Sequence, residues 1–166
     1  MVIKIGTSGW SYDHWHPELY PPGLPVGDRL ARYATAFSTA ELNSSFYRWP
    51  RPAAFSSWRD RLPDGFRLSV KAPRGLTHAR KLYAPETWLH RIAAGWHELG
   101  DKRAVLLVQL PPSLPRDDAG YFLGFLLLAG GLLGQRIAVG QVITHDRPEV
   151  HLLQRLVLGL HWGEVC

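Results

Sequence analysis

The chain has 166 residues, of which 46% are hydrophobic, and it carries a formal net charge of +5 at pH 7. This length predicts one domain, because compact domains usually contain about 100–200 residues. The only cysteine, Cys166, excludes an internal disulfide bond and a cysteine-based metal site.

Four short apolar runs, each ending in polar and aromatic residues, predict β-strands. They lie at residues 2–5, 39–43, 66–71 and 103–110. The first is followed by a long segment, residues 7–25, which contains four prolines and four aromatic residues. Ordered segments of this length inside compact domains are usually functional.

Segments with helical spacing separate the strands. Apolar residues recur at i, i+3, i+4 and i+7 over residues 27–37, which predicts a helix. Pro52 and Pro85 stand where a proline favours the first turn of a second and a third helix. Farther along, Asp117 is a candidate cap for a fourth helix, residues 136–139 a candidate fifth strand, and residues 148–158 a candidate fifth helix.

The alternation of strands and helices predicts an α/β fold with parallel strands and right-handed crossovers. A β/α barrel and a doubly wound sheet both fit this pattern, and both carry their chemistry where the strands end. A complete barrel needs about 200–250 residues. The chain is therefore expected to hold about five of the eight units of a barrel.

Glu41 and Asn43 lie two residues apart on the second predicted strand, so both side chains point to the same face. A carboxylate on an inner face is costly unless it is paired or used in chemistry. Glu41 is therefore either a general acid and base or a ligand for a substrate hydroxyl, or else a structural carboxylate paired with Lys71 or an arginine.

Three further polar residues lie at or after the ends of the third and fourth strands. Lys71 is a candidate catalytic base or anion ligand, although an ion pair with Glu41 is the expected resting state. His78 has the side chain best suited to proton transfer near neutral pH, but a single histidine in a loop is more often a surface residue. Gln109 offers one acceptor and two donors to a ligand.

Aromatic residues gather after the first two predicted strands and could stack on a flat ligand or cover the mouth of a barrel. They are Trp10, Tyr12, Trp15, Tyr20, Phe46, Tyr47 and Trp49. The cofactor stays unidentified, because the sequence has neither a GxGxxG motif nor a P-loop lysine, and no metal cluster is predicted.

The excess of basic residues fits a phosphate-containing small molecule and, less strongly, a nucleic acid. The first residues enter a strand without the apolar run of a signal peptide, and the longest uncharged stretch, residues 119–134, is short and glycine-rich for a membrane span. The expectation is a cytoplasmic protein with no membrane partner.

Four ordered motifs carry a resemblance to a known family. GTSGWSYDHW, ELNSSFYRWP, VKAPRGLTH and VQLPPS resemble the domain-of-unknown-function family 72, the YecE-like proteins, over residues 1–119. The resemblance implies a TIM barrel of unsettled activity. It also implies that the site falls on the positions that match the motifs: Thr7, Trp10, Tyr12, Glu41, Asn43, Tyr47, Lys71, Thr77, His78 and Gln109.

The rest of the single domain, residues 120–166, departs from the family pattern. Family members continue with a Glu-Phe-Arg-His-like run, whereas residues 140–145 read Gly-Gln-Val-Ile-Thr-His. Local changes of reading frame or a truncated gene are the hypothesis for this departure. A partial barrel exposes strand edges, which predicts self-association.

Three functions fit these features. The first is a hydrolase or lyase acting on a phosphate- or sugar-containing substrate, with Glu41 as acid and base and with Lys71 and Arg74 holding negative charge. The second is a non-catalytic module that binds a ligand or a nucleic acid. The third is an incomplete chain without activity of its own.

Overall fold

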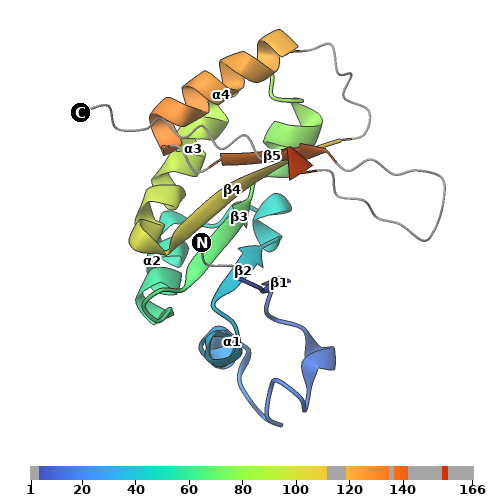
Figure 1. Ribbon diagram of the computed structural model, residues 1–166, viewed down its shortest axis with the longest axis vertical. Helices are drawn as coiled ribbons and strands as arrows, with labels where there is room; N and C mark the ends of the chain where they lie inside the picture. The colour runs from blue at the N-terminus through green and yellow to red at the C-terminus, as the bar shows by residue number, and fades with distance from the viewer. Residues whose placement is uncertain (1–3, 112–118, 135–136, 142–154, 157–166) are drawn as a thin grey trace, which may run out of the picture.

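The computed structural model describes residues 4–111, 119–134, 137–141 and 155–156. These residues form one six-stranded sheet in the order β1-β2-β3-β4-β5-β6 (Figure 1). The first five strands run parallel to one another, and β6 is antiparallel to β5. The strands are β1 (Thr7–Ser8), β2 (Thr39–Leu42), β3 (Arg67–Lys71), β4 (Arg103–Leu110), β5 (Ile137–Gln141) and β6 (Arg155–Leu156).

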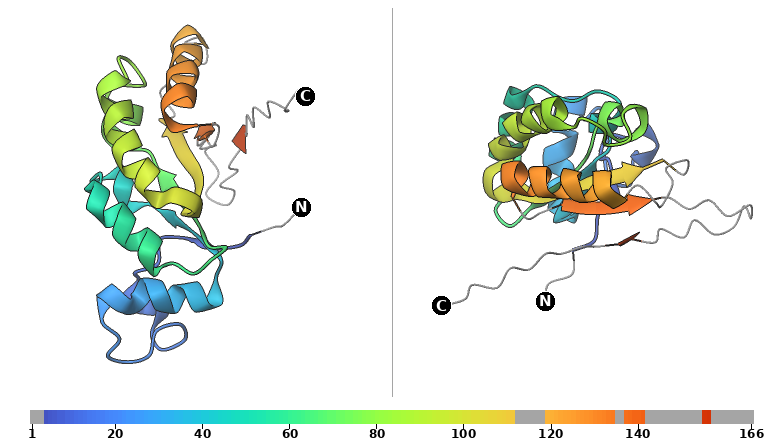
Figure 2. Two further views of the ribbon diagram at one scale, coloured as in Figure 1. Left: turned by 90° about the vertical axis from the view of Figure 1, so that its left-hand side faces the viewer. Right: turned by 90° about the horizontal axis from the view of Figure 1, so that it is seen from above.

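Helices α2 and α3 cover one face of this sheet, as the side view in Figure 2 shows. The long helices are α1 (Arg29–Ala36), α2 (Pro52–Arg61), α3 (Glu86–Trp96) and α4 (Ala119–Leu133). Short helical turns join them to the strands: η1 (Asp13–Trp15), η2 (Val26–Asp28), η3 (Ser44–Phe46), η4 (Gly75–Ala79) and η5 (His97–Lys102).

The strands alternate between a buried face and a half-buried face. Leu42 of β2, Val70 of β3 and Val108 of β4 are at most 2% exposed and belong to the hydrophobic core. Their neighbours Glu41 and Lys71 are only partly buried. Because side chains alternate along a strand, the helices cover one face, and the face that would line a barrel keeps polar residues.

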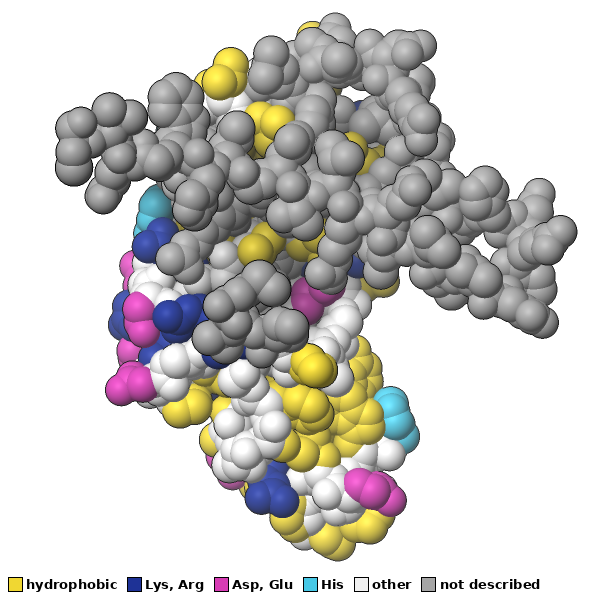
Figure 3. Space-filling view, in the orientation of Figure 1, with side chains coloured by type: hydrophobic (Ala, Val, Ile, Leu, Met, Phe, Trp, Pro, Cys, Tyr) yellow, Lys and Arg dark blue, Asp and Glu magenta, His cyan; other side chains and the backbone are white. Residues whose placement is uncertain are grey.

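Arg29 at the start of α1 fixes the long segment between β1 and α1. Its guanidinium donates to Asp13 Oδ1 at 2.7 Å and to Ser11 Oγ at 3.3 Å, and it lies over the Tyr20 ring. The Tyr20 hydroxyl donates to the backbone carbonyl of Trp10. Hydrophobic atoms colour the lower part of the molecule in Figure 3, where this segment lies. The segment is therefore ordered by its own polar contacts and aromatic packing.

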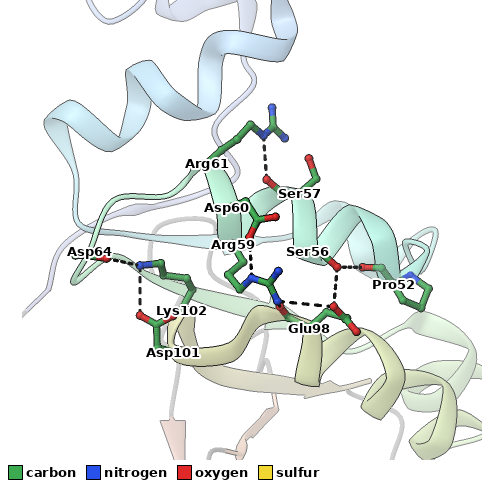
Figure 4. A network of polar contacts seen from close by, with 10 residues as sticks. All are labelled: Pro52, Ser56, Ser57, Arg59, Asp60, Arg61, Asp64, Glu98, Asp101 and Lys102. Carbon is green, nitrogen blue, oxygen red and sulfur yellow. Dashed lines mark hydrogen bonds and ion pairs between the residues drawn. The ribbon is translucent and has the colours of Figure 1, made fainter.

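A polar network joins α2 to η5 at the other end of the sheet (Figure 4). Lys102, only 4% exposed, places Nζ 3.2 Å from Asp64 Oδ1 and 3.3 Å from Asp101 Oδ2. Arg59 donates to the carbonyl of Glu98 at 2.9 Å, and Ser56 donates to the carboxylate of Glu98 at 2.7 Å. These contacts lie where strands β3 and β4 begin. In a β/α barrel, residues at this end of the strands contribute to stability rather than to catalysis.

The second, third and fourth predicted strands are confirmed, and the candidate fifth strand corresponds to β5. Of the first, only Lys4 and Ile5 lie within the described residues, and both stand outside β1, which begins at Thr7. The helix expected over residues 148–158 was wrong where it can be compared, since Arg155 and Leu156 pair with β5. Asp117 lies outside the described residues.

No helix in the described part of the chain has both the length and the apolar character that a membrane crossing requires.

Candidate functional site

Polar side chains form a row across the first three strands on the half-buried face. The sheet register places Ser8 of β1 opposite Glu41 of β2, and Glu41 opposite Ser69 of β3. Ser8 Oγ donates to Glu41 Oε1 at 3.2 Å. A half-buried carboxylate held by a hydroxyl group is oriented toward the face on which a barrel carries its site.

Lys71 does not pair with Glu41, because none of the ion pairs among the described residues joins them. The register explains this outcome: Ser69 stands opposite Glu41, and Lys71 lies two residues closer to the end of β3. The Lys71 ammonium instead lies 4.9 Å from the centroid of the Phe46 ring. The expected ion pair between Glu41 and Lys71 was therefore wrong.

His78 in η4 packs against the same Phe46 ring as Lys71. Its ring lies 5.0 Å from that of Phe46, edge to face, and its Nδ1 lies 2.9 Å from Thr77 Oγ1. Burial, followed by the nearby charges of Arg74 and Lys71, holds the pKa of His78 below its usual range. The imidazole is therefore neutral at pH 7 and able to accept a proton.

A cavity of about 570 Å³ opens between the turns that follow β2 and β3. Its size lies within the range of small-molecule sites. The polar side chains in its wall include three arginines and a histidine, and the lining contains no carboxylate. The lining residues are Phe46, Tyr47, Arg48, Trp49, Pro73, Arg74, Gly75, His78, Ala79, Trp88 and Arg91. Among the predicted site residues, Tyr47, Arg74 and His78 line this cavity.

The predicted residues of the first segment have structural contacts. The Thr7 hydroxyl lies 2.7 Å from the carbonyl of Gly9 and 3.0 Å from the Tyr33 hydroxyl. The Tyr12 hydroxyl donates to the carbonyl of Ser8 at 2.6 Å. Trp10 packs edge to face against Trp58 of α2. Thr7, Trp10 and Tyr12 are not part of the cavity wall.

Asn43 and Gln109 occupy the ends of strands β2 and β4. Asn43 is the residue before η3, and its Oδ1 is buried without a hydrogen-bond partner among the described residues. Gln109 is half-buried on β4 and pairs in register with Gly140 of β5. Both lie at the carboxyl ends of the strands, as predicted, and neither lines the cavity.

Sequence reasoning missed Arg48, Trp88 and Arg91 as members of the cavity wall. The three-residue spacing of Trp88 and Arg91 on α3 places them on one side of the helix, and the Arg91 guanidinium lies 5.4 Å from the centroid of the Trp88 ring. A cation three residues after an aromatic residue in a helix was the available signal. It is weak, because it also occurs on ordinary helix surfaces.

Within residues 4–111 and the shorter described segments, no three histidine, cysteine or acidic side chains gather in a way that could hold a metal ion.

Parallel strands joined by helices, with polar side chains at the strand ends, define the chain as an incomplete β/α barrel of the TIM type. The sequence pattern described as "Protein of unknown function DUF72" matches residues 4–139. The chain belongs to the DUF72 family. The match extends the resemblance, which the motifs carry over residues 1–119, as far as β5.

The relatives agree with this assignment. The chain is 27% identical over 117 residues to the UPF0759 protein YecE of Escherichia coli K12, a match that covers 70% of this chain and 40% of YecE. A DUF72 crystal structure from Enterococcus faecalis has a TM-score of 0.67 at 19% identity. This match covers 83% of the present chain and 50% of the Enterococcus faecalis chain. A DUF72 crystal structure from Thermotoga maritima has a TM-score of 0.66 at 24% identity. This match covers 88% of the present chain and 58% of the Thermotoga maritima chain. The chain thus spans about half the length of these relatives.

Proposed function

We propose that this chain carries part of the site of a barrel enzyme, a hydrolase or lyase that acts on a phosphate- or sugar-containing substrate. The observation that supports the proposal is the grouping at the ends of β2 and β3. A carboxylate held by Ser8 lies near the end of β2, an ammonium group lies at the end of β3, and a neutral imidazole contacts the same Phe46 ring as that ammonium group. Enzymes with this fold place their chemistry at that end.

Each group has a distinct role in the proposal. Glu41 exchanges protons with the substrate, and Ser8 keeps its carboxylate in place. His78 is the second proton-transfer group, because its pKa lies below the usual range and the neutral form predominates near pH 7. Lys71 and Arg74 hold negative charge on the substrate. Asn43, Gln109 and the aromatic residues Trp10, Tyr12 and Tyr47 complete the substrate contacts together with Thr7.

The test is an activity screen of the purified chain and of full-length E. coli YecE against phosphate monoesters, phosphate diesters and glycosides. Release of phosphate or of reducing sugar is measured. Glu41→Gln and His78→Gln should each lower the rate at least about 100-fold, which is the usual contribution of a positioned acid or base. Glu18→Gln, an exposed residue of the first segment, is the matched control and should keep the rate.

Equal rates in Glu41→Gln and in the unchanged chain would contradict the role of Glu41. An absence of turnover by both proteins on every class of substrate would contradict the enzyme proposal.

A non-catalytic module is the second candidate. Arginines and aromatic rings share the cavity wall, a combination that also suits the phosphates and bases of single-stranded nucleic acid. Salt-dependent retention of the chain on single-stranded DNA would favour this candidate, and no retention at low salt would remove it.

A further inference from the structure

We propose that the cavity between η3, η4 and α3 binds the phosphate group of a small phosphate monoester that carries a flat ring. Arg48, Arg74 and Arg91 provide the phosphate contacts, and Trp88 with Tyr47 faces the ring. The proposal rests on the proposed function only where it treats this ester as a substrate. Binding itself requires no catalysis.

The charge of the cavity wall is the first argument. The three arginines come from different elements, namely the turn after η3, the residue before η4 and helix α3. None of them takes part in the ion pairs found in the described ranges, whose cations are Arg29, Arg59 and Lys102. Arginine residues that line one cavity without a carboxylate are suited to a phosphate, which guanidinium groups bind through paired N–H donors.

The shape of the wall is the second argument. Trp88 packs directly on Gly75, where any Cβ atom would overlap the indole ring. The Arg91 guanidinium lies over the Trp88 ring in a cation–π contact. Tyr47 is 77% exposed at the cavity, although large aromatic side chains are usually more buried. A held indole and an exposed phenol form surfaces on which a flat ring can stack.

Two polar groups of the wall still lack partners or charge. Trp49 is 8% exposed, and its Nε1 has no hydrogen-bond acceptor in the described part of the chain. The Thr77 hydroxyl donates to the carbonyl of Pro73, so we assign the Nδ1 proton of His78 to the bond with Thr77 and leave Nε2 as the proton acceptor. Nε2 of His78 can take up a proton and then donate a hydrogen bond to a phosphate oxygen.

His78 links anion binding to protons. The groups around it are the Phe46 ring, Thr77, Lys71 and Arg74, with Arg48 and Arg91 in the same cavity wall. A dianionic phosphate offsets the two cations that lower the pKa of His78, and the pKa therefore rises when the ester binds. Proton uptake should accompany binding below about pH 7.

The dimensions favour a small ester over a nucleic-acid strand. A volume of about 570 Å³ holds one phosphate and one ring system, whereas a strand requires a groove that follows its backbone over several nucleotides. A monoester carries close to two negative charges at pH 7, and a diester in a strand carries one. Three arginines match the monoester better.

The experiment is calorimetric titration of the chain with phenyl phosphate, inorganic phosphate, phenol and a single-stranded oligonucleotide. We expect phenyl phosphate to bind more tightly than inorganic phosphate, and phenol not to bind. Arg48→Gln and Arg74→Gln should each weaken phenyl phosphate binding about tenfold or more, because each removes a charge-assisted contact. Arg80→Gln, an exposed residue outside the cavity wall, is the matched control and should bind as the unchanged chain does.

Repetition at pH 6 in buffers with different ionisation enthalpies should show proton uptake that His78→Gln abolishes. Thermal melts establish that the variants are folded. Any one of three results would overturn the proposal. Phenyl phosphate fails to bind, all the arginine variants bind it as the unchanged chain does, or only the oligonucleotide binds. If Glu41→Gln binds phenyl phosphate with unchanged affinity but does not turn it over, the result supports this site. If the unchanged chain binds phenyl phosphate without any turnover, the result contradicts only the proposed enzyme function.

Discussion

The Phe46 ring lies in contact with both Lys71 and His78 near the ends of strands β2 and β3. Its ring contacts the Lys71 ammonium and the imidazole of His78, and it packs edge to face on Tyr47. The sequence placed Phe46 among aromatic residues that follow the second strand, but its contact with a lysine 25 positions later depends on the pairing of β2 with β3. Lys71 and His78 thus contact the same aromatic ring.

The pKa of His78 tests this arrangement directly. Burial lowers it, and Arg74 and Lys71 lower it further, so NMR titration should give a value below the usual histidine pKa of about 6.5. Because the folded state binds this proton more weakly than the unfolded state, this histidine reduces stability as the pH falls below about 6.5. Arg74→Gln should raise the pKa, whereas Arg80→Gln should not. Equal pKa values in all three proteins would contradict the electrostatic explanation.

Lys102 has a structural role at the opposite end of the sheet. Its side chain is 6% exposed, whereas that of its partner Asp64 is fully exposed. Lys102→Ala should lower the free energy of unfolding by about 2 kcal/mol, because it removes methylene groups that are buried in the fold. Asp64→Asn is the matched change on the exposed side and should have little effect. Urea unfolding measures both, and similar losses would mean that the ion pair, rather than the stem, is responsible.

The repeated elements follow local rules. Pro52 begins α2, and β4 covers residues 103–110, as the apolar runs and proline positions predict. Predictions at the two ends of the chain were poorer. Lys4 and Ile5 precede the first paired strand among the described residues, and the short pairing of Arg155 and Leu156 depends on a distant partner. A strand is defined by its neighbour, which composition alone does not reveal.

Two glycines in helices should respond in opposite directions to the same substitution. A Cβ at Gly95 of α3 would overlap the Phe55 ring of α2, whereas one at Gly131 of α4 meets no atom of the described residues within 4 Å. We expect Gly95→Ala to destabilise the fold by about 1–3 kcal/mol. We expect Gly131→Ala to stabilise it by up to about 1 kcal/mol through helix propensity. Chemical unfolding of both variants measures the difference, and a loss of stability in both would contradict the open surroundings of Gly131.

For the whole molecule, the important feature is the half-buried face of the sheet. Helices cover the other face, and in a complete barrel further strands would close around Glu41, Ser69 and Lys71. This chain spans about half the length of the DUF72 relatives. The residues of the cavity wall all come from turns and helices that follow β2 and β3, so that cavity is formed within the described part.

An open sheet predicts self-association. Strand edges with unpaired backbone groups recruit other chains, and Ile5 next to β1 is 76% exposed. Light scattering during gel filtration should show dimers or larger species whose fraction rises with protein concentration. Ile5→Lys should reduce this fraction, whereas Val26→Lys, at an exposed residue of η2, should not. A chain that stays monomeric at all concentrations would contradict this prediction.

The sequence by itself determined the alternation of strands and helices, the family motifs and the position of Glu41, Lys71 and Gln109 at strand ends. These features are local, since periodicity and turn residues specify them within about ten residues. The tertiary structure decided which side chains meet. The register set Glu41 opposite Ser69 and thereby separated it from Lys71, and the packing of α3 beside η4 brought Arg91 and Trp88 to the same cavity as His78. Such contacts join residues far apart in the chain, and only the folded sheet fixes their distances.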